Sequence, residues 1–315
     1  WERWLRQELW LQNQRLSQVQ QQQQGKDEQM QTWQGKDLFT TEIEPASIAL
    51  YKFRTGQWDE FSFLSKSLMG KTKKNMTKKQ RNMTIARLNF LRDITSGVPS
   101  AKEAEIVILE VLLRLEAAAN SENGDGGGVI SRYIDGILPS IEKWALWMAV
   151  VRPSPMQRHA RVFALLDAID DFDSLGAAES DNDMIASLRE GINEYEFGAS
   201  AGGKRLATAI LKRMNTHLVV EDGKKVPDGI DTATVEMIQQ QDWPSEEDRE
   251  EWSNRIGNLA LISSARPRQR AKKDKADVSS WENKCKRYKK EPWMLTRELA
   301  ELDRWGISAV QDQQK

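Results

Sequence analysis

The chain has 315 residues, of which 39% are apolar and 30% charged, and its formal net charge is −1. This length allows two ordinary domains, or one helical domain with a smaller module, and the near-neutral total charge favours no class of partner. No apolar run approaches the ~18 residues that a membrane-spanning helix needs. We therefore expect a soluble, intracellular protein without a membrane span, and the first residue, Trp1, is compatible with processing from a longer precursor.

Residues that commonly carry chemistry are scarce. Cys285 is the single cysteine, which excludes an internal disulfide and a cysteine metal cage. The two histidines, His159 and His217, cannot build a histidine-rich metal centre, and any histidine base must be one of them. No cofactor and no metal site is predicted.

Residues 1–35 form the first predicted segment. Apolar residues recur near helical spacing from Trp1 to Val19, which predicts an amphipathic helix, and a glutamine-rich stretch follows at Gln20 to Gln24. The simpler interpretation is a helix that packs on the body of the protein. Because aromatic residues are enriched at interfaces, binding of a protein partner is the alternative.

Residues 36–220 form a predicted helical domain with almost no period-two alternation. Helical periodicity predicts helices at 83–95, 101–119, 130–151, 156–172, 181–195 and 204–218. The segment NSENGDGGG at 120–128 predicts a surface loop, not a phosphate-binding loop, because no strand precedes it and no Gly-Lys-Ser/Thr follows. The predicted fold class is therefore mainly α over this part.

Residues 221–315 have a different pattern of apolar residues, which predicts a small α+β module of the ββα type. Short apolar runs suited to strands include residues 235–238 and 256–262, and helical periodicity returns over 281–302. Between 266 and 290 stand eleven Lys or Arg residues against three acidic ones. A basic cluster of this kind can bind a phosphate backbone or simply be a solvated surface, as can a second cluster at 71–81.

Ordered motifs in this last module resemble one known family. They are TVEMIQQQ at 234–241, Trp243, Trp252, RIGNLALI at 255–262, WENK at 281–284, and TREL at 296–299 with Trp305. In this order and spacing they resemble the C-terminal HNH, or His-Me finger, nuclease domain of GmrSD-type restriction endonucleases. The corresponding family motifs are Ile-Glu-His-Ile-x-Pro-Gln, Leu-Gly-Asn-Leu-Thr-Leu-Leu and Phe-x-x-Lys. The preceding helices resemble the family's helical region more loosely, and its ParB-like N-terminal domain is not found in this sequence.

The resemblance implies a damaged catalytic apparatus. In HNH enzymes a histidine activates water, and a divalent cation neutralises charge on the phosphate. The resemblance places that histidine at Met237, whose thioether takes no proton and is a poor ligand for hard cations. The motif's proline is Gln239 or Gln240, and no asparagine occurs in the loop near residues 266–270.

Three positions of the motif remain, namely Glu236, Asn258 and Lys284. Structural interpretations stay open for two of them: Asn258 can belong to a turn kept for its backbone geometry, and Lys284 can be a surface lysine on a helix. His217 lies about twenty residues upstream on a predicted helix and is a poor substitute for the missing base.

We therefore predict a catalytically inactive HNH-nuclease-like protein that binds nucleic acid through a basic loop and helix. The predicted binding residues are Arg266, Arg268, Arg270, Lys272, Lys273, Lys275, Lys286 and Arg287. A scaffold subunit of a larger protein assembly, without nucleic acid, is the alternative that twelve tryptophans support. A second alternative is an active metal-dependent nuclease.

Overall fold

The structure is a computed structural model that describes residues 43–65, 76–121, 126–170, 182–238, 243–263, 280–302 and 305–314. The chain divides into two compact units, residues 1–48 and 49–315, and of the first only residues 43–48 are described. The described residues are mainly helical and contain one two-stranded antiparallel sheet near the C-terminus. The predicted fold class is thereby confirmed, whereas the predicted helix at 1–19 lies outside the described residues.

Helices account for nearly all regular structure before residue 222. They are α3 (Glu44–Thr55), α4 (Lys78–Gly97), α5 (Ala104–Ala119), α6 (Gly126–Arg132), α7 (Leu138–Val151), α8 (Pro155–Asp170), α10 (Asn182–Glu194) and α11 (Ala201–Glu221). A π-helical turn, Tyr133–Ile137, joins α6 to α7. The glycines Gly126 to Gly128 begin α6, so the predicted surface loop at 120–128 is wrong in its last three residues.

Local sequence determines where the two long helices next to the candidate site, α4 and α11, begin or end. A capping box starts α4, in which Gln80 N donates to Thr77 Oγ1 at 3.1 Å and Thr77 N donates to Gln80 Oε1 at 3.0 Å. Helix α4 ends at Gly97, two residues before Pro99, as expected because proline disfavours helix in the residue before it. Helix α11 is capped by Ser200, whose Oγ accepts from Gly203 N at 2.9 Å.

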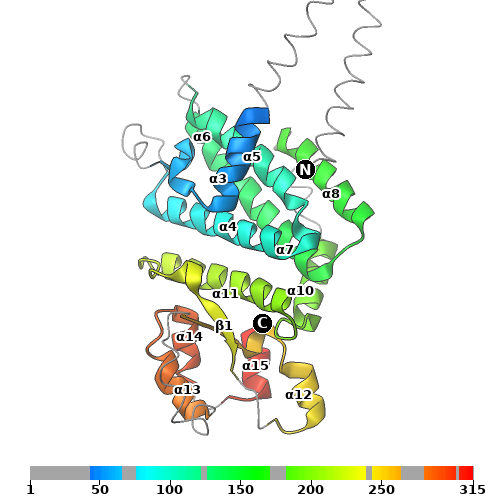
Figure 1. Ribbon diagram of the computed structural model, residues 1–315, viewed down its shortest axis with the longest axis vertical. Coiled ribbons are helices and arrows are strands. Elements are labelled where there is room, and N and C mark those ends of the chain that lie inside the picture. The colour runs from blue at the N-terminus through cyan, green and yellow to red at the C-terminus, as the bar shows by residue number, and fades with distance from the viewer. Residues whose placement is uncertain are drawn as a thin grey trace, which may run out of the picture. The chain divides into compact units, whose positions relative to one another are not determined.

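Helix α11 lies between the helical body and the C-terminal module. It packs along α4 on one side and contacts β1, β2 and α14 on the other (Figure 1). A half-buried ionic cluster links α11 to the helical body. In it, Glu142 on α7 pairs with both Arg213 on α11 and Arg87 on α4. Among the described helices, none combines the length and the apolar character that crossing a bilayer requires.

The C-terminal module is built on the strands β1 (Thr234–Met237) and β2 (Leu259–Ile262), which pair with Thr234 opposite Ile262. The helices are α12 (Glu246–Trp252), α13 (Trp281–Tyr288), α14 (Met294–Leu299) and α15 (Ile307–Gln314). A small core joins Ile238, Ala260, Tyr288 and Leu299.

Three details correct the sequence prediction for this module. Residues 256–258 form a 3-10 turn, so the second strand starts at Leu259. The single helix predicted over 281–302 is two helices, with Pro292 in the break between α13 and α14. Helix α15 was not predicted. The predicted domain boundaries at 35/36 and 220/221 remain predictions.

Candidate functional site

The paired strands bring the motif residues of β1 beside the turn that precedes β2. Met237 stands opposite Leu259 in the sheet register, and Ile238 N donates to the carbonyl of Asn258 at 2.9 Å. Because side chains alternate along a strand, Glu236 and Met237 point to opposite faces of the sheet. Glu236 and Met237 therefore contact different parts of the protein.

Met237, where the sequence resemblance places the family's histidine, faces the turn before α11. Its side chain is half-buried, and its Cε lies 3.3 Å from where a Cβ on Gly198 would stand. Gly198 N in turn donates to the carbonyl of Asn254 at 2.9 Å. Met237 therefore fills space against a tight turn, and its thioether sulfur has no proton to exchange.

Glu236 is paired on the opposite face. Its carboxylate forms an ion pair with Arg287 of α13, and the two side chains are only 23% and 22% exposed. The guanidinium of Arg287 also lies 5.2 Å from the ring centroid of Tyr288. Arg287 is thus engaged with the module itself, although the sequence predicted it as a nucleic-acid ligand.

Lys284 is buried, with 8% of its surface exposed, so the interpretation of a surface lysine is wrong. Its Nζ donates to the carbonyl of Met237 at 3.1 Å and also to the carbonyl of Ile238. Burial lowers the pKa of this ammonium, because the charged form loses hydration. Lys284 therefore ties α13 to the end of β1 through two carbonyl groups of the main chain.

Asn258 is fully buried and bonded at both ends of its amide. Its Nδ2 donates to the carbonyl of Ser253 at 3.0 Å, and its Oδ1 accepts from Trp305 Nε1 at 3.2 Å. The neighbouring Gly257 has no room for a side chain, since a Cβ would lie 2.2 Å from the carbonyl oxygen of Val310. These contacts favour the interpretation that the Gly-Asn-Leu turn is kept for its geometry.

Two buried polar residues that the sequence analysis did not identify hold the other strand. Thr296 Oγ1 donates to the carbonyl of Leu261 at 2.5 Å. The carboxylate of Glu291 accepts from Ser263 N at 3.0 Å and from Ser263 Oγ at 2.8 Å. Thr296 lies within the TREL motif, so its place in the family pattern was a usable signal for this role.

The described residues at this place do not fit a divalent cation. Glu236, the carboxylate within β1, is paired with a guanidinium, and the ammonium of Lys284 lies at the end of the same strand. Such cations repel a metal ion, and a thioether is a weak ligand for Mg²⁺ or Mn²⁺. Within the described ranges, no group of three His, Cys, Asp or Glu side chains is arranged so that it could hold a metal ion.

The predicted basic residues are only partly covered by the structure. Arg266, Arg268, Arg270, Lys272, Lys273 and Lys275 lie outside the described residues. On α13, Lys286 is exposed and pairs with Glu282 at 2.7 Å. Of the two histidines, His217 is exposed on α11, and His159 on α8 lies 3.6 Å from Glu103.

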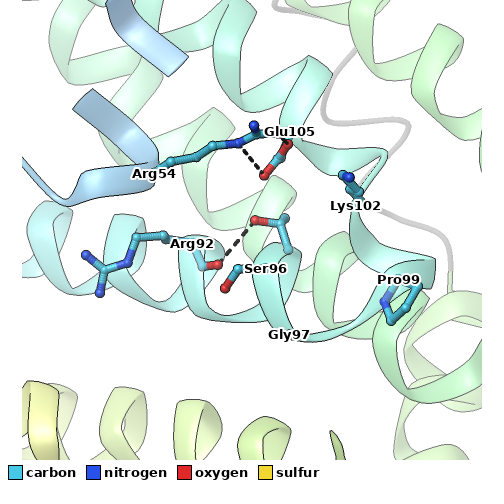
Figure 2. A pocket seen from close by; sticks show the side chains of 8 residues that line it. Arg54, Arg92, Ser96, Gly97, Pro99, Lys102 and Glu105 are labelled. Atoms are coloured by element: carbon cyan, nitrogen blue, oxygen red, sulfur yellow. Dashed lines mark hydrogen bonds and ion pairs between the residues drawn. The ribbon is translucent and has the colours of Figure 1, made fainter. Parts of the chain in front are cut away.

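A polar groove adjoins the start of β1, and the sequence analysis did not identify it. It consists of two hollows that share Ser96 and Gly97 at the end of α4, of about 510 and 550 Å³. The first is lined by Arg54, Arg92, Thr95, Ser96, Gly97, Pro99, Lys102 and Glu105 (Figure 2). The second is lined by Asp93, Ser96, Gly97, Lys204, Arg205, Thr208, Ala209, Lys212, Asp231, Thr234 and Val235. We call these two hollows the α4–α11 groove.

Comparison with known proteins supports the motif assignment. Residues 204–315 match the family model described as GmrSD restriction endonucleases, C-terminal domain. No curated protein and no solved structure matches the chain. The match begins in the first turn of α11 and includes both strands and the helices α12 to α15. It confirms the predicted resemblance: the C-terminal third of the chain is similar to the C-terminal domain of the GmrSD restriction endonucleases, a nuclease-related family.

Proposed function

We propose that this protein is a catalytically inactive relative of the GmrSD nucleases that binds nucleic acid. Met237 carries the proposal, because it stands where the family has the histidine that activates water. Loss of a general base alone removes a factor of about 10²–10⁴ in rate. The internal contacts of Glu236 and Lys284 support the same conclusion, since neither side chain is available to a metal ion or a scissile phosphate.

The binding part of the proposal rests on charge. The chain keeps a segment of eleven cations from 266 to 290 within the GmrSD-type domain, and phosphate contacts dominate the affinity of proteins for nucleic acid. Lys284 is buried, so the exposed contribution of α13 and the turn after it comes from Lys286, Lys289 and Lys290. The loop residues from Arg266 to Lys275 supply the larger share of this charge.

A scaffold without nucleic acid is the second candidate, and its support was the number of tryptophans. The eight tryptophans in the described ranges are all buried or half-buried, so they form no exposed aromatic patch. The other four, among them Trp1, Trp4 and Trp10, lie outside those ranges. Nucleic-acid binding is therefore the proposal that the described residues favour.

The test of inactivity is a plasmid-nicking assay with Mg²⁺ or Mn²⁺. We expect no cleavage by the wild type, and none by Met237→His, because the paired Glu236 and buried Lys284 would still be unavailable. Cleavage that persists through repurification and disappears in Glu236→Gln would contradict the proposal. Thermal melting of each variant would establish that it is folded.

The test of binding is a gel-shift or anisotropy titration of the full chain against duplex and single-stranded oligonucleotides over a series of salt concentrations. Replacing Arg266, Arg268 and Arg270 by Ala should lower the log–log salt slope by up to about 2.7 units on duplex, at ~0.9 per phosphate contact. Absence of binding by folded, monodisperse wild type near physiological salt would favour the scaffold.

A further inference from the structure

The α4–α11 groove has an excess of positive charge. Six of its lining side chains are cations and three are carboxylates. Two of the carboxylates are already paired within the groove, Glu105 with Arg54 at 2.5 Å and Asp93 with Arg92 at 3.1 Å. The third, Asp231, presents its main-chain carbonyl to Lys212 Nζ at 2.7 Å. What remains is a surface with three cations in excess.

Three exposed cations carry this excess, namely Lys102, Lys204 and Arg205. Within the described part of the chain, none of the three makes an ion pair or a side-chain hydrogen bond, in contrast to Arg54 and Arg92. Lys102 lies in the turn that leads into α5, and the other two are the fourth and fifth residues of α11. The Cβ of Arg205 is 3.9 Å from the place of a Cβ on Gly97, so the end of α4 and the start of α11 meet closely.

The placement of Lys204 and Arg205 opposes the stability of their own helix. The N-terminus of a helix carries a partial positive charge, so cations near it lower the stability of the helix, most of all at low salt. The first turn of α11 contains no acidic residue that offsets them. Burial also lowers the pKa of Lys212, which lies further along the same hollow. A bound anion would relieve all of these costs at once.

The position of the groove links it to the GmrSD-type domain. Its second hollow includes Thr234 and Val235, the first residues of the strand that ends at Met237. Lys204, Arg205 and Lys212 lie inside the segment that matches the family, whereas Arg92 and Lys102 belong to the preceding helical part. A ligand in the groove would therefore contact both parts of the chain.

We propose that the α4–α11 groove is a phosphate-binding site and that the backbone of a nucleic acid supplies the phosphates. Charge complementarity argues for an anion, and two neighbouring hollows that share Ser96 and Gly97, each lined by cations, suit a chain of phosphates better than a single phosphate. The choice of a nucleic acid as ligand rests on the function proposed above. The phosphate-binding chemistry of the groove does not.

The experiment compares four forms of the full chain. They are the wild type, a groove variant (K102A, K204A, R205A), the loop variant (R266A, R268A, R270A) and a control (K143A, R189A, K225A). The control removes two lysines and one arginine from exposed positions outside the groove, as the groove variant does within it. Each form is titrated with fluorescent single-stranded and duplex oligonucleotides, and its melting temperature is measured with and without tripolyphosphate.

We expect the groove variant to bind oligonucleotides about tenfold more weakly than the control at about 50 mM salt, with a salt slope lower by up to about 2 units on single strands. Tripolyphosphate should raise the melting temperature of the wild type and the control, but not of the groove variant, because only a ligand that binds the folded state stabilises it. Melting without ligand shows whether the groove variant is folded. If it is not, K102Q, K204Q, R205Q replaces it.

The outcomes separate this inference from the proposed function. Equal behaviour of the groove variant and the control with both ligands would overturn the phosphate site, even if the loop variant loses oligonucleotide binding. No oligonucleotide binding by the wild type would refute the proposed function and the choice of nucleic acid. A groove-dependent effect of tripolyphosphate in that case would still establish the phosphate site, with a free phosphorylated molecule as its ligand.

Discussion

Strand β1 begins beside the α4–α11 groove and ends beside Lys284, and the charged residues near its two ends differ in what they contact. At the end of the strand, Lys284 donates to two main-chain carbonyls and Glu236 pairs with Arg287. At its start, the exposed cations Lys204 and Arg205 make no such contact among the described residues. The family motif therefore marks residues that hold the module together, and the groove presents residues that no motif singles out.

The difference shows that a motif residue can be present for a structural reason, without the catalytic function that the motif has in the family. If the base is absent, as proposed, a motif residue that serves catalysis alone has no remaining role, whereas one that also supports the fold does. Asn258 and Lys284 do so through Ser253, Trp305 and the carbonyls that end β1. Their presence in the motif is thus explained by packing and hydrogen bonding, without any catalytic step.

The largest effect should follow from Lys284→Ala, with Lys286→Ala as the matched control on the same helix. The first change leaves two buried carbonyls without a donor and creates a cavity, so we expect a loss of about 3 kcal/mol in the free energy of unfolding. Lys286 is exposed and pairs with Glu282 at the surface, so its loss should cost much less. Urea unfolding of both variants measures the difference, and similar losses would show that Lys284 does not hold β1.

The sequence predicted the strand, strand and helix order of the module because its signals are local. Motif spacing located β1, the Gly-Asn-Leu turn and α13 to within a few residues. The burial of Lys284 could also have been predicted from the sequence. Trp281, Lys284 and Tyr288 are three and four residues apart and share one helical face, so a lysine between two core aromatics is expected to be buried.

The groove could not be predicted in the same way. Its first hollow depends on α3, the end of α4 and the start of α5 coming together. Its second hollow depends on the end of α4 meeting the start of α11, as Gly97 and Arg205 do across more than a hundred residues of sequence. The periodicity of apolar residues along the sequence does not predict a contact between such distant segments. A partial signal did exist, because Lys204 and Arg205 follow closely on the start of a helix that has no acidic residue in its first turn, contrary to the usual preference. That signal indicates that the two cations lower the stability of α11, but it does not identify the end of α4 as the segment that packs against them.

A smaller effect, of opposite sign, is expected at the groove. Lys204→Glu places a carboxylate at the positive end of α11, and we expect the free energy of unfolding to rise by up to about 1 kcal/mol at low salt. The same change should weaken phosphate binding, so stability and binding would move in opposite directions. A control is Lys212→Glu, further along the same helix and partly buried, which should destabilise. Thermal melting at low and high salt would measure these changes, and a loss of stability in Lys204→Glu at low salt would contradict the account of the groove.

The smallest effect is a pH dependence from Lys284, and its sign follows from burial. The pKa of the folded-state ammonium is lowered, so between that pKa and the ordinary value near 10.4 the unfolded chain binds more protons than the folded one. Stability therefore rises with pH across this window, relative to a variant without the group. The neutral amine keeps two N–H groups, enough to donate to the carbonyls of both Met237 and Ile238. We expect the stability difference between the wild type and Lys284→Met to grow from pH 7 to pH 10 in parallel urea titrations, whereas the difference for Lys286→Met should show no such growth. A difference for Lys284→Met that shrinks over this range would mean that the two carbonyls favour the ammonium more strongly than burial opposes it.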